Sequence, residues 1–358
     1  METAEATDDN NSAPLHISAS NSHVGIVELL FRKGPSTKII DEDNTTPLHL
    51  AAGGGYTGLV EFLLGNTPSK LEGHTSVLEL LFGNGTSIEA TDNDKNTPLH
   101  LAACNGHTSM VDLLLRKRAS IEAVGQYSNT PLHFAAREGH SGTVHLLLQK
   151  GSLIEALNLG NNTPLHLAAW KGHTGMVDLL LIKGASIAAI GEHGSTPLHF
   201  AAQGGHTGTV ELLLEKGASI EAIGEYTRTP LHTTAAEGHT GTVELLLQNG
   251  ASIKARDEQR NTALHLAAGK GHTGTVDLLL KNGASIEASG LDDRTPLHDA
   301  AWGGHTGAVE LLLEKGASTE ARNIFYQTPL ELAAGDGHTD VVQLLKSKVA
   351  ELARGSCA

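Results

Sequence analysis

The chain has 358 residues, of which only 3% are aromatic, and it carries 41 glycines, 21 histidines and a net charge of −15. So acidic a chain lacks a basic surface from which to release the counterions of a phosphate backbone, and we expect no nucleic-acid partner. There is no apolar run of membrane-spanning length, the acidic N-terminus is unlike a secretion signal, and Cys104 and Cys357 make no disulfide framework. These features predict an intracellular, cytoplasmic protein without membrane insertion, with the nucleus as the alternative location.

Residues 1–12 are polar and acidic and predict a disordered tail. From residue 13 onward one segment recurs along the chain. The sequence TPLH, or a variant of it with one change, begins at residues 13, 46, 97, 130, 163, 196, 229, 262, 295 and 328. Every spacing is 33 residues except that from 46 to 97, which is 51. A fixed period of this length is typical of repeat proteins.

Each repeat predicts two short helices, as residues 196–228 illustrate. Thr196 is expected to cap the first helix with its hydroxyl, and Pro197 suits the first helical position because its missing N–H costs nothing there. Gly205 is expected to end that helix in the left-handed conformation. The second helix places three apolar side chains in one buried stripe: Val210, Leu213 and Leu214. We number positions within a repeat from the residue equivalent to Thr196.

Both helices are too short to be stable alone in water, where isolated helices of under about 12 residues are marginal. Each repeat must therefore bury its apolar faces against its neighbours. The predicted fold class is an all-α repeat solenoid, in which stability comes from contacts between adjacent repeats.

The repeated motifs T-P-L-H-[LF]-A-A, G-H-T, [VM]-x-L-L-L and G-A-S-I-E-A resemble the ankyrin repeat, over residues 13 to about 350. The resemblance implies about eleven tandem repeats, one of them degenerate. Each would be a helix-turn-helix unit with a short β-hairpin or loop finger, stacked into a curved array. It also implies protein partners on the concave surface made by fingers and first helices. Position 29, often Asp in the family, is Asp, Gly or Asn here; these residues tolerate positive φ, which we expect there.

The repeat starts predict the organisation of the chain. Residues 13–45 form an N-terminal capping repeat, 97–327 seven regular repeats, and 328–358 a C-terminal capping repeat, with both end surfaces polar so that the array is complete. Two repeats need 66 residues, 15 more than the 51 between the starts at 46 and 97. Residues 46–96 are therefore interpreted as two truncated repeats that lack a finger. The deletion falls at Gly65–Ser76, and an error in the gene model is the alternative. We expect the finger row to break there, at the weakest interface of the stack.

Nineteen of the 21 histidines occupy two repeat positions, in TPLH and in GHT, and only His145 and His193 fall outside. A metal site needs ligands that converge on one point, whereas a repeat spreads equivalent residues in a row. We therefore predict that these histidines bond the backbone near helix ends and turns, joining adjacent repeats. If they are buried and neutral, stability should fall as the pH falls through about 6.5.

No pattern in the sequence indicates catalysis or a cofactor. Two G-x-G-x-x-G matches, GGGYTG and GKGHTG, lie in turns between helices and lack the preceding strand that a dinucleotide site requires. Cys104 has no base placed beside it and is interpreted as an exposed or half-buried thiol. We predict that the protein is not an enzyme and needs no metal or cofactor.

The residues that vary within the constant repeat are the candidates for recognition. Interface hot spots favour Trp, Tyr and Arg, and these types occur here at the ends of first helices and in the fingers. The predicted partner-binding residues are Tyr127, Arg137, Trp170, His193, Tyr226, Arg228, Arg260, Arg294, Trp302, Phe325 and Tyr326.

These features predict a monomeric, non-enzymatic scaffold that binds a partner protein. Three alternatives remain: an elastic spacer, a regulatory or inhibitory subunit of a larger assembly, and an enzyme whose active site is assembled across repeats. The acidic fingers would also suit a basic partner segment.

Overall fold

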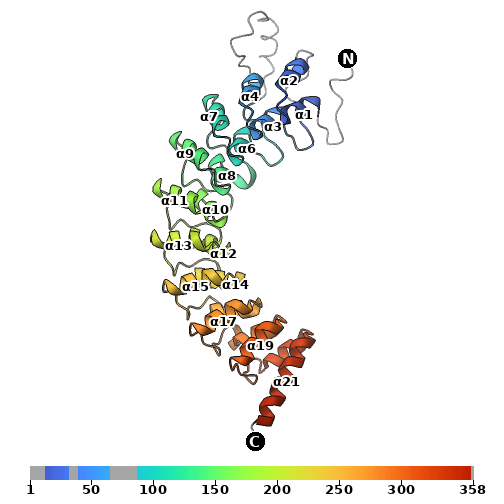
Figure 1. The fold of residues 1–358 in the computed structure, drawn as a ribbon, viewed down its shortest axis with the longest axis vertical. Helices are drawn as coiled ribbons and strands as arrows, with labels where there is room; N and C mark the ends of the chain where they lie inside the picture. Colours follow the sequence, from blue (N-terminus) through green and yellow to red (C-terminus); the bar gives the residue numbers. More distant parts are fainter. Residues whose placement is uncertain (1–12, 32–38, 65–86, 356–358) are drawn as a thin grey trace, which may run out of the picture. The chain divides into compact units, whose positions relative to one another are not determined.

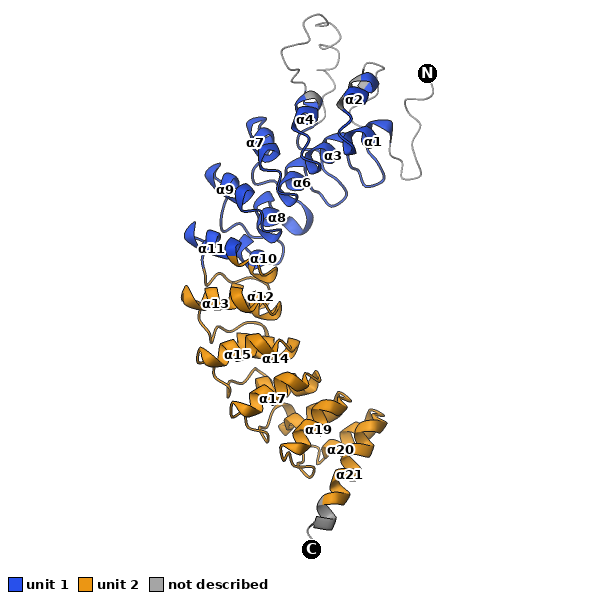
Figure 2. Cartoon of the chain, viewed as in Figure 1, with its two compact units in different colours: residues 1–168, 175–186 blue, residues 169–174, 187–358 orange. Residues whose placement is uncertain are grey.

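Figure 1 shows the computed structural model of the chain, which describes residues 13–31, 39–64 and 87–355. The chain divides into two compact units, coloured separately in Figure 2. Unit 1 comprises residues 1–168 and 175–186, and unit 2 comprises residues 169–174 and 187–358.

The helices of unit 1 are α1 (Pro14–Ser20), α2 (Val24–Phe31), α3 (Pro47–Gly53), α4 (Thr57–Leu63), α6 (Pro98–Cys104), α7 (Thr108–Arg116), α8 (Pro131–Arg137) and α9 (Ser141–Gln149). Helices α10 (Pro164–Trp170) and α11 (Thr174–Ile182) have residues in both units.

The helices of unit 2 are α12 (Pro197–Gln203), α13 (Thr207–Glu215), α14 (Pro230–Glu237), α15 (Thr240–Gln248), α16 (Ala263–Gly269), α17 (Thr273–Lys281), α18 (Pro296–Trp302), α19 (Thr306–Glu314), α20 (Pro329–Gly335) and α21 (Thr339–Gly355).

The prediction of an all-α solenoid is confirmed. In each unit, first helices pack against first helices of adjacent repeats and second helices against second helices, as α12 does with α14 and α13 with α15. The described residues contain no strand, so the fingers are loops rather than β-hairpins. Four fingers contain a single turn of 3₁₀ helix: η1 (Gln126–Ser128), η2 (Glu192–Gly194), η3 (Glu225–Thr227) and η4 (Leu291–Asp293). No described helix is both long and apolar enough to cross a bilayer.

The core consists of small and branched apolar side chains that lie between helices. In the repeat beginning at Thr196 the fully buried side chains are Leu198, Ala201, Ala202, Val210 and Leu213. Leu214 of the predicted stripe is only half-buried. The paired alanines let neighbouring first helices approach closely, and removal of this apolar surface from water is the main stabilising term.

The predicted helix ends are confirmed, and Thr196 forms a capping box with His199 at the start of α12. Thr196 is the N-cap of α12 with extended dihedral angles, Pro197 is the first helical residue, and Gly205 has φ +67°. The Thr196 hydroxyl lies 2.9 Å from Nδ1 of His199. It bonds the imidazole, and the imidazole in turn accepts the Thr196 N–H at 3.2 Å.

The contacts around residues 46–96 favour a single repeat over the two truncated repeats of the prediction. The Asn93 N–H donates to the Asp43 carbonyl at 2.8 Å, which joins adjacent fingers without a break. His107 likewise donates from Nε2 to the Gly53 carbonyl at 2.9 Å, although 54 residues separate them instead of the usual 36. We therefore interpret residues 46–96 as one repeat with an insertion of 51 − 33 = 18 residues. The stretch Gly65–Ser76 itself lies outside the described residues, as does the predicted tail at 1–12.

The two ends of the described stack differ. Helix α21 runs on for 17 residues, and no large apolar side chain is exposed between Gln327 and Glu351. The expected polar surface of the first repeat is wrong, because it exposes Ile17, Ile26 and Leu29. The remaining repeat boundaries stay predictions.

Candidate functional site

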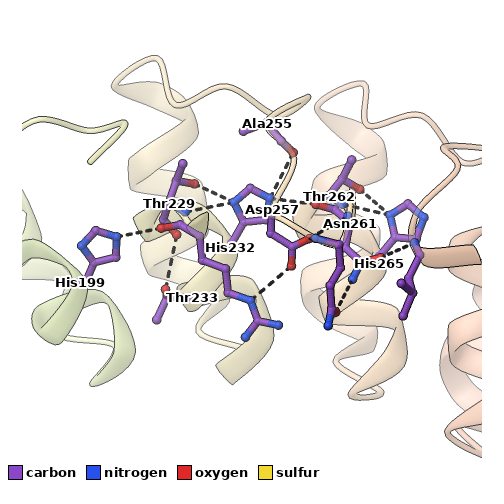
Figure 3. A network of polar contacts seen from close by, with 12 residues as sticks. His199, Thr229, His232, Thr233, Ala255, Asp257, Asn261, Thr262 and His265 are labelled. Carbon is purple, nitrogen blue, oxygen red and sulfur yellow. Dashed lines mark hydrogen bonds and ion pairs between the residues drawn. The ribbon is translucent and has the colours of Figure 1, made fainter. Parts of the chain in front are cut away.

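The TPLH histidines form a row of neutral imidazoles that joins each first helix to the finger that follows it (Figure 3). Nδ1 of His232 accepts the Thr229 N–H at 3.3 Å, while Nε2 lies 3.2 Å from the Asn261 carbonyl. A backbone N–H can only donate and a carbonyl can only accept. The proton must therefore sit on Nε2, and a second proton would remove the acceptor at Nδ1. The same pair of bonds is made by His16, His49, His100, His133, His199, His265 and His298.

Burial gives these imidazoles depressed pKa values because the charged form would lose its hydration. Burial lowers the pKa of His100, His133 and His265 to about 4. The hydrogen bonds to backbone carbonyls raise these pKa values, but by less than burial lowers them. The pKa is also lowered, with burial again the largest cause, in His49, His199, His232 and His298. These seven imidazoles are therefore neutral at physiological pH.

The GHT histidines form a second row, in which Nε2 donates to the carbonyl at the end of the preceding first helix. His239, for example, bonds the Gln203 carbonyl at 2.9 Å, and its ring lies against Gly205. Equivalent bonds are made by His107, His140, His206, His272, His305 and His338. The prediction that histidines join adjacent repeats is confirmed for the GHT row, whereas the TPLH histidines bond the backbone of their own repeat. No group of three or more potential metal ligands occurs in the part of the chain that the structure describes.

The finger turn is built differently from the prediction, because position 29 does not have positive φ. Gly125 and Gly224 have φ −105° and −111°. Where position 29 is Asp or Asn, the side chain accepts backbone N–H groups instead, as Asp257 does from Gln259 at 3.0 Å and Asn261 at 2.9 Å. In the fingers that have glycine at position 29, the residues with positive φ are those at positions 31 and 32. These positions hold Tyr127 and Ser128, His193 and Gly194, Tyr226 and Thr227, and Asp292 and Asp293.

These left-handed residues strain the fingers, since a non-glycine residue there costs about 1–2 kcal/mol. Tyr226 (φ 54°) and Thr227 (φ 55°) adopt this conformation in succession, and Thr is β-branched, which makes it a poor choice. Strain of this kind is common at functional sites. It places the Tyr127 and Tyr226 side chains on the surface of their fingers.

The largest group of exposed apolar side chains in unit 2 lies in the repeat that begins at Thr295 and in the finger before it. Trp302 is 51% exposed, Phe325 61% and Tyr326 77%. The finger of Phe325 bonds the preceding finger through the Ile324 N–H and the Asp292 carbonyl, 3.0 Å apart. We call this group the aromatic finger patch; it consists of Leu291, Trp302, Ile324, Phe325 and Tyr326. Sequence analysis missed Leu291 and Ile324, because it weighed aromatic residues and arginines alone.

Arg294 and Asp299 lie beside this patch and carry charges that the protein itself leaves poorly compensated. The Arg294 guanidinium lies over the Trp302 ring at 5.1 Å, and its Nε is buried without a hydrogen-bond partner. Asp299 occupies position 5, which in other repeats holds Leu, Phe, Ile or Thr. Burial raises the pKa of Asp299 to about 7, although Arg294 lowers it. Asp299 was also missed, and its departure from the apolar pattern was the available signal.

A second pairing of Arg with an aromatic ring lies two repeats earlier. The Arg228 guanidinium stacks on Tyr226 at 5.3 Å, and its Nε lies 3.4 Å from the buried carboxylate of Asp257. Arg260 faces Asp293 of the next finger at 3.5 Å. These two arginines are therefore held by the protein's own carboxylates, unlike Arg294.

Comparison with known proteins agrees with this repeat geometry. The family described as "Ankyrin repeats (3 copies)" matches residues 2–71, 69–158, 165–257 and 253–323. The chain belongs to the ankyrin-repeat family. No curated protein matches it. Among solved structures, the human ASB11 ankyrin repeat domain is similar, with 32% identity and a TM-score of 0.56 over 62% of this chain and 98% of that one. Ankyrin repeats are generally protein-interaction modules and are typically non-catalytic.

Three of the remaining predicted residues of this ankyrin-repeat chain, Arg137, Trp170 and His193, contact other side chains of the protein. In unit 1, Tyr127 is exposed, but Arg137 bonds Glu138 at 2.7 Å and lies over the Phe134 ring. In unit 2, the Trp170 ring is covered by the Lys171 ammonium at 4.7 Å, and His193 faces Glu225 at 3.5 Å. Cys104 is half-buried, which is one of the two alternatives, exposed or half-buried, that the sequence left open. Burial raises the pKa of its thiol, which makes it a poor nucleophile.

Replacing Asp299 with the apolar residue of other ankyrin repeats should stabilise the protein. Because its folded pKa lies above the unfolded value, the unfolded chain binds fewer protons between pH 4 and 7, and Asp299 destabilises increasingly as the pH rises. We expect Asp299→Leu to increase the free energy of unfolding by about 2 kcal/mol at pH 8, after allowance for partial exposure. The gain should be clearly smaller at pH 4, where the folded carboxyl is protonated and only the added apolar burial of Leu remains. Urea denaturation at the two pH values measures it, and equal gains at both would contradict the assignment.

Proposed function

We propose that this ankyrin-repeat protein is a non-enzymatic scaffold that binds a partner protein through the fingers and first helices of unit 2. In the arrangement that the resemblance to ankyrin repeats implies, the fingers and first helices form the concave surface. The aromatic finger patch is the observation that carries the proposal. Large apolar side chains that are this exposed mark interaction sites when they are contiguous. Here three of them, Ile324, Phe325 and Tyr326, follow one another in a single finger.

The charges beside the patch support the same surface. The buried Nε of Arg294 is a donor without an acceptor, and an unmet donor costs about 1–3 kcal/mol. Asp299 likewise lowers stability where an apolar residue would raise it. Natural sequences retain such residues where function requires them.

The location proposed for this scaffold is the cytoplasm, since a reducing compartment suits a chain with two cysteines so far apart in sequence. A spacer remains the weaker proposal, because it gives no role to the aromatic finger patch. Regulation of a larger assembly is compatible with binding through the same surface.

The triple variant Trp302→Ala/Phe325→Ala/Tyr326→Ala tests the proposal. We expect affinity purification with mass-spectrometric readout to recover a partner with the wild type and to lose at least nine tenths of it with the triple variant, because hot-spot aromatics each contribute about 2 kcal/mol or more. Ile182→Ala removes an equally exposed apolar side chain at the end of a second helix and serves as the matched control. It should retain the partner. Both variants should melt within a few degrees of the wild type.

Retention of every partner by the triple variant would refute the proposal that the aromatic finger patch binds the partner. Loss of the partner in both variants would point to general damage rather than to the patch. Exchange of the Ile324–Tyr326 finger segment with that of another repeat without loss of binding would show that this finger does not select the partner.

A further inference from the structure

The fingers of unit 1 differ in charge along the chain. Each finger comprises positions 28–33 of its repeat, and in unit 1 these are residues 40–45, 91–96, 124–129 and 157–162. The first two fingers contain five acidic residues and one basic residue, Lys95. The third and fourth contain no charged residue. Unit 1 therefore presents a pair of acidic fingers followed by a pair of uncharged ones.

The uncharged fingers expose four large apolar side chains. Val124, Tyr127, Leu157 and Leu159 are between 56% and 73% exposed, and Leu159 is the most exposed of the four. Leu159 occupies position 30, where the other fingers of unit 1 have Glu, Asn or Gln. Tyr127 has φ 55°, a conformation that is unfavourable for residues other than glycine. Neither residue is the one that solubility or backbone conformation would favour, and departures of this kind are typical of functional sites.

These four side chains lie on fingers that are bonded to each other. The Leu159 N–H donates to the Tyr127 carbonyl at 2.8 Å. Val124 and Leu157 hold the same position, 28, in the same two fingers. We call the four residues the unit 1 finger patch. Contiguous exposed apolar side chains of this size mark interaction sites.

The acidic fingers expose carboxylates that the protein does not pair with a cation. Asp41 and Asp92 accept backbone N–H groups of their own fingers. Glu42, Asp43 and Asp94 are exposed, and none of the three forms an ion pair with another described residue. Three carboxylates are therefore available to a partner.

The acidic and the uncharged fingers form one continuous row. The side-chain amide of Asn93 donates to the Glu42 carbonyl at 3.0 Å and joins the two acidic fingers. The Gln126 N–H donates to Oδ1 of Asn96 at 3.0 Å and joins the second acidic finger to the first uncharged one. Packed helices lie about 10 Å apart, so four fingers span about 30 Å, which is the length of about nine residues of extended chain.

Charge selects the occupant of this row. A second copy of the chain carries a net charge of −15, and residues 1–12 contain four acidic residues and no basic one. The acidic fingers repel both, since like charges disfavour association. A segment that carries lysine or arginine is attracted instead, and large apolar residues in it would cover the uncharged fingers. The occupant that complements both halves of the row is a partner segment with a basic end and an apolar end.

We propose that the fingers of unit 1 bind an extended segment of a partner protein, with its lysine or arginine residues on Glu42, Asp43 and Asp94 and its large apolar residues on the unit 1 finger patch. The ionic contacts steer association and set the direction of the segment, while the apolar contacts supply most of the affinity. The site is separate from the aromatic finger patch of unit 2, and neither proposal depends on the other.

Selection of random 12-residue peptides by the full chain tests the chemistry of the occupant. We expect the recovered peptides to share lysine or arginine near one end and large apolar residues near the other. Their affinity, measured by fluorescence anisotropy, should fall about tenfold or more between about 50 mM and about 300 mM sodium chloride, because salt screens the ionic contacts.

Charge reversal tests the acidic half of the row. Glu42→Lys/Asp94→Lys should weaken binding of these peptides about tenfold or more at low salt and remove most of the salt dependence. Glu211→Lys/Glu244→Lys makes the same change in net charge on exposed positions of the second helices and serves as the matched control. It should bind the peptides within about threefold of the wild type.

Truncation tests the apolar half. Tyr127→Ala/Leu159→Ala should weaken binding about tenfold or more and leave the salt dependence unchanged, because it removes only apolar contact. Phe325→Ala/Tyr326→Ala, in the aromatic finger patch, should bind these peptides like the wild type. Loss of binding in that variant instead would place the peptides in unit 2 and overturn the proposal.

Hydrogen exchange of the wild type makes the test independent of whether the variants fold. Bound peptide should slow exchange in residues 91–96, 124–129 and 157–162 and leave α20 and α21 unchanged. Recovery of no peptide, or of peptides without basic residues, would overturn the proposal. Peptides that bind both variants of the unit 1 fingers as tightly as the wild type would do the same.

Discussion

Acidification from pH 7.5 to 5.5 should reduce the free energy of unfolding by about 4 kcal/mol through three histidines alone. These are His100, His133 and His265, whose folded pKa values are about 4. Each is expected to contribute about 1.4 kcal/mol, because the unfolded imidazole, with a pKa near 6.5, is mostly protonated at pH 5.5 while the folded one is not. The other lowered histidines of the row add to the effect.

The sign follows from the direction of the pKa shift. A histidine whose folded pKa is depressed binds fewer protons in the folded state, so stability is complete above pH 6.5 and is lost progressively down to pH 4. The carboxyl of Asp299 acts in the opposite sense over this range, because its folded pKa is raised to about 7. Chemical denaturation as a function of pH is therefore best measured in the Asp299→Leu variant, where this offset is absent.

A matched pair of variants assigns the effect to the row. His265→Gln removes one buried imidazole. It should therefore reduce the loss of unfolding free energy between pH 7.5 and 5.5 by the contribution of one histidine. His145→Gln changes an exposed histidine outside the two repeat positions and serves as the matched control. An unfolding free energy that stays constant between pH 7.5 and 5.5 would rule out the neutral row.

Gly205→Ala should destabilise the protein by about 3 kcal/mol, more than twice the cost of Gly217→Ala. Both glycines have positive φ, +67° and +94°, so each alanine incurs a conformational cost of about 1 kcal/mol. They differ in their surroundings. A Cβ at Gly205 would lie 2.5 Å from Nδ1 of His239, whereas a Cβ at Gly217 has nothing within 4 Å. The ring must move and lose its bond to the Gln203 carbonyl, which adds about 2 kcal/mol.

Urea denaturation of the two variants and of the double variant Gly205→Ala/His239→Ala measures this contact. In the His239→Ala background the added cost of Gly205→Ala should fall to that of Gly217→Ala, because the ring is gone. Equal costs for the two glycines in the wild-type background would show that the imidazole adapts freely.

The partner-binding residues were predicted only in part. Tyr226, Trp302, Phe325 and Tyr326 are exposed, as a search for aromatic residues at variable positions anticipated. Nothing local distinguishes Arg294, whose Nε is unpartnered, from Arg260, which meets Asp293 of the next finger. That difference depends on which side chains the stacking brings within reach.

The interval between residues 46 and 97 likewise could not be interpreted without knowing which residues the stacking brings together. Its length allowed two truncated repeats or one repeat with an insertion, and arithmetic on the sequence chose the first. The bonds from Asn93 to Asp43 and from His107 to Gly53 favour the second, because they join residues about 50 positions apart along the chain.

By itself, the sequence determined the period, the pairs of short helices, their ends at Thr-Pro and glycine, and the apolar stripe between repeats. These features follow from backbone preferences and spacing within a single repeat. Only the tertiary structure decided the proton position on each TPLH imidazole, the raised pKa of Asp299 and the exposure of Ile26. Each of these depends on burial or on partners that folding and stacking bring within reach, and no local pattern encodes them.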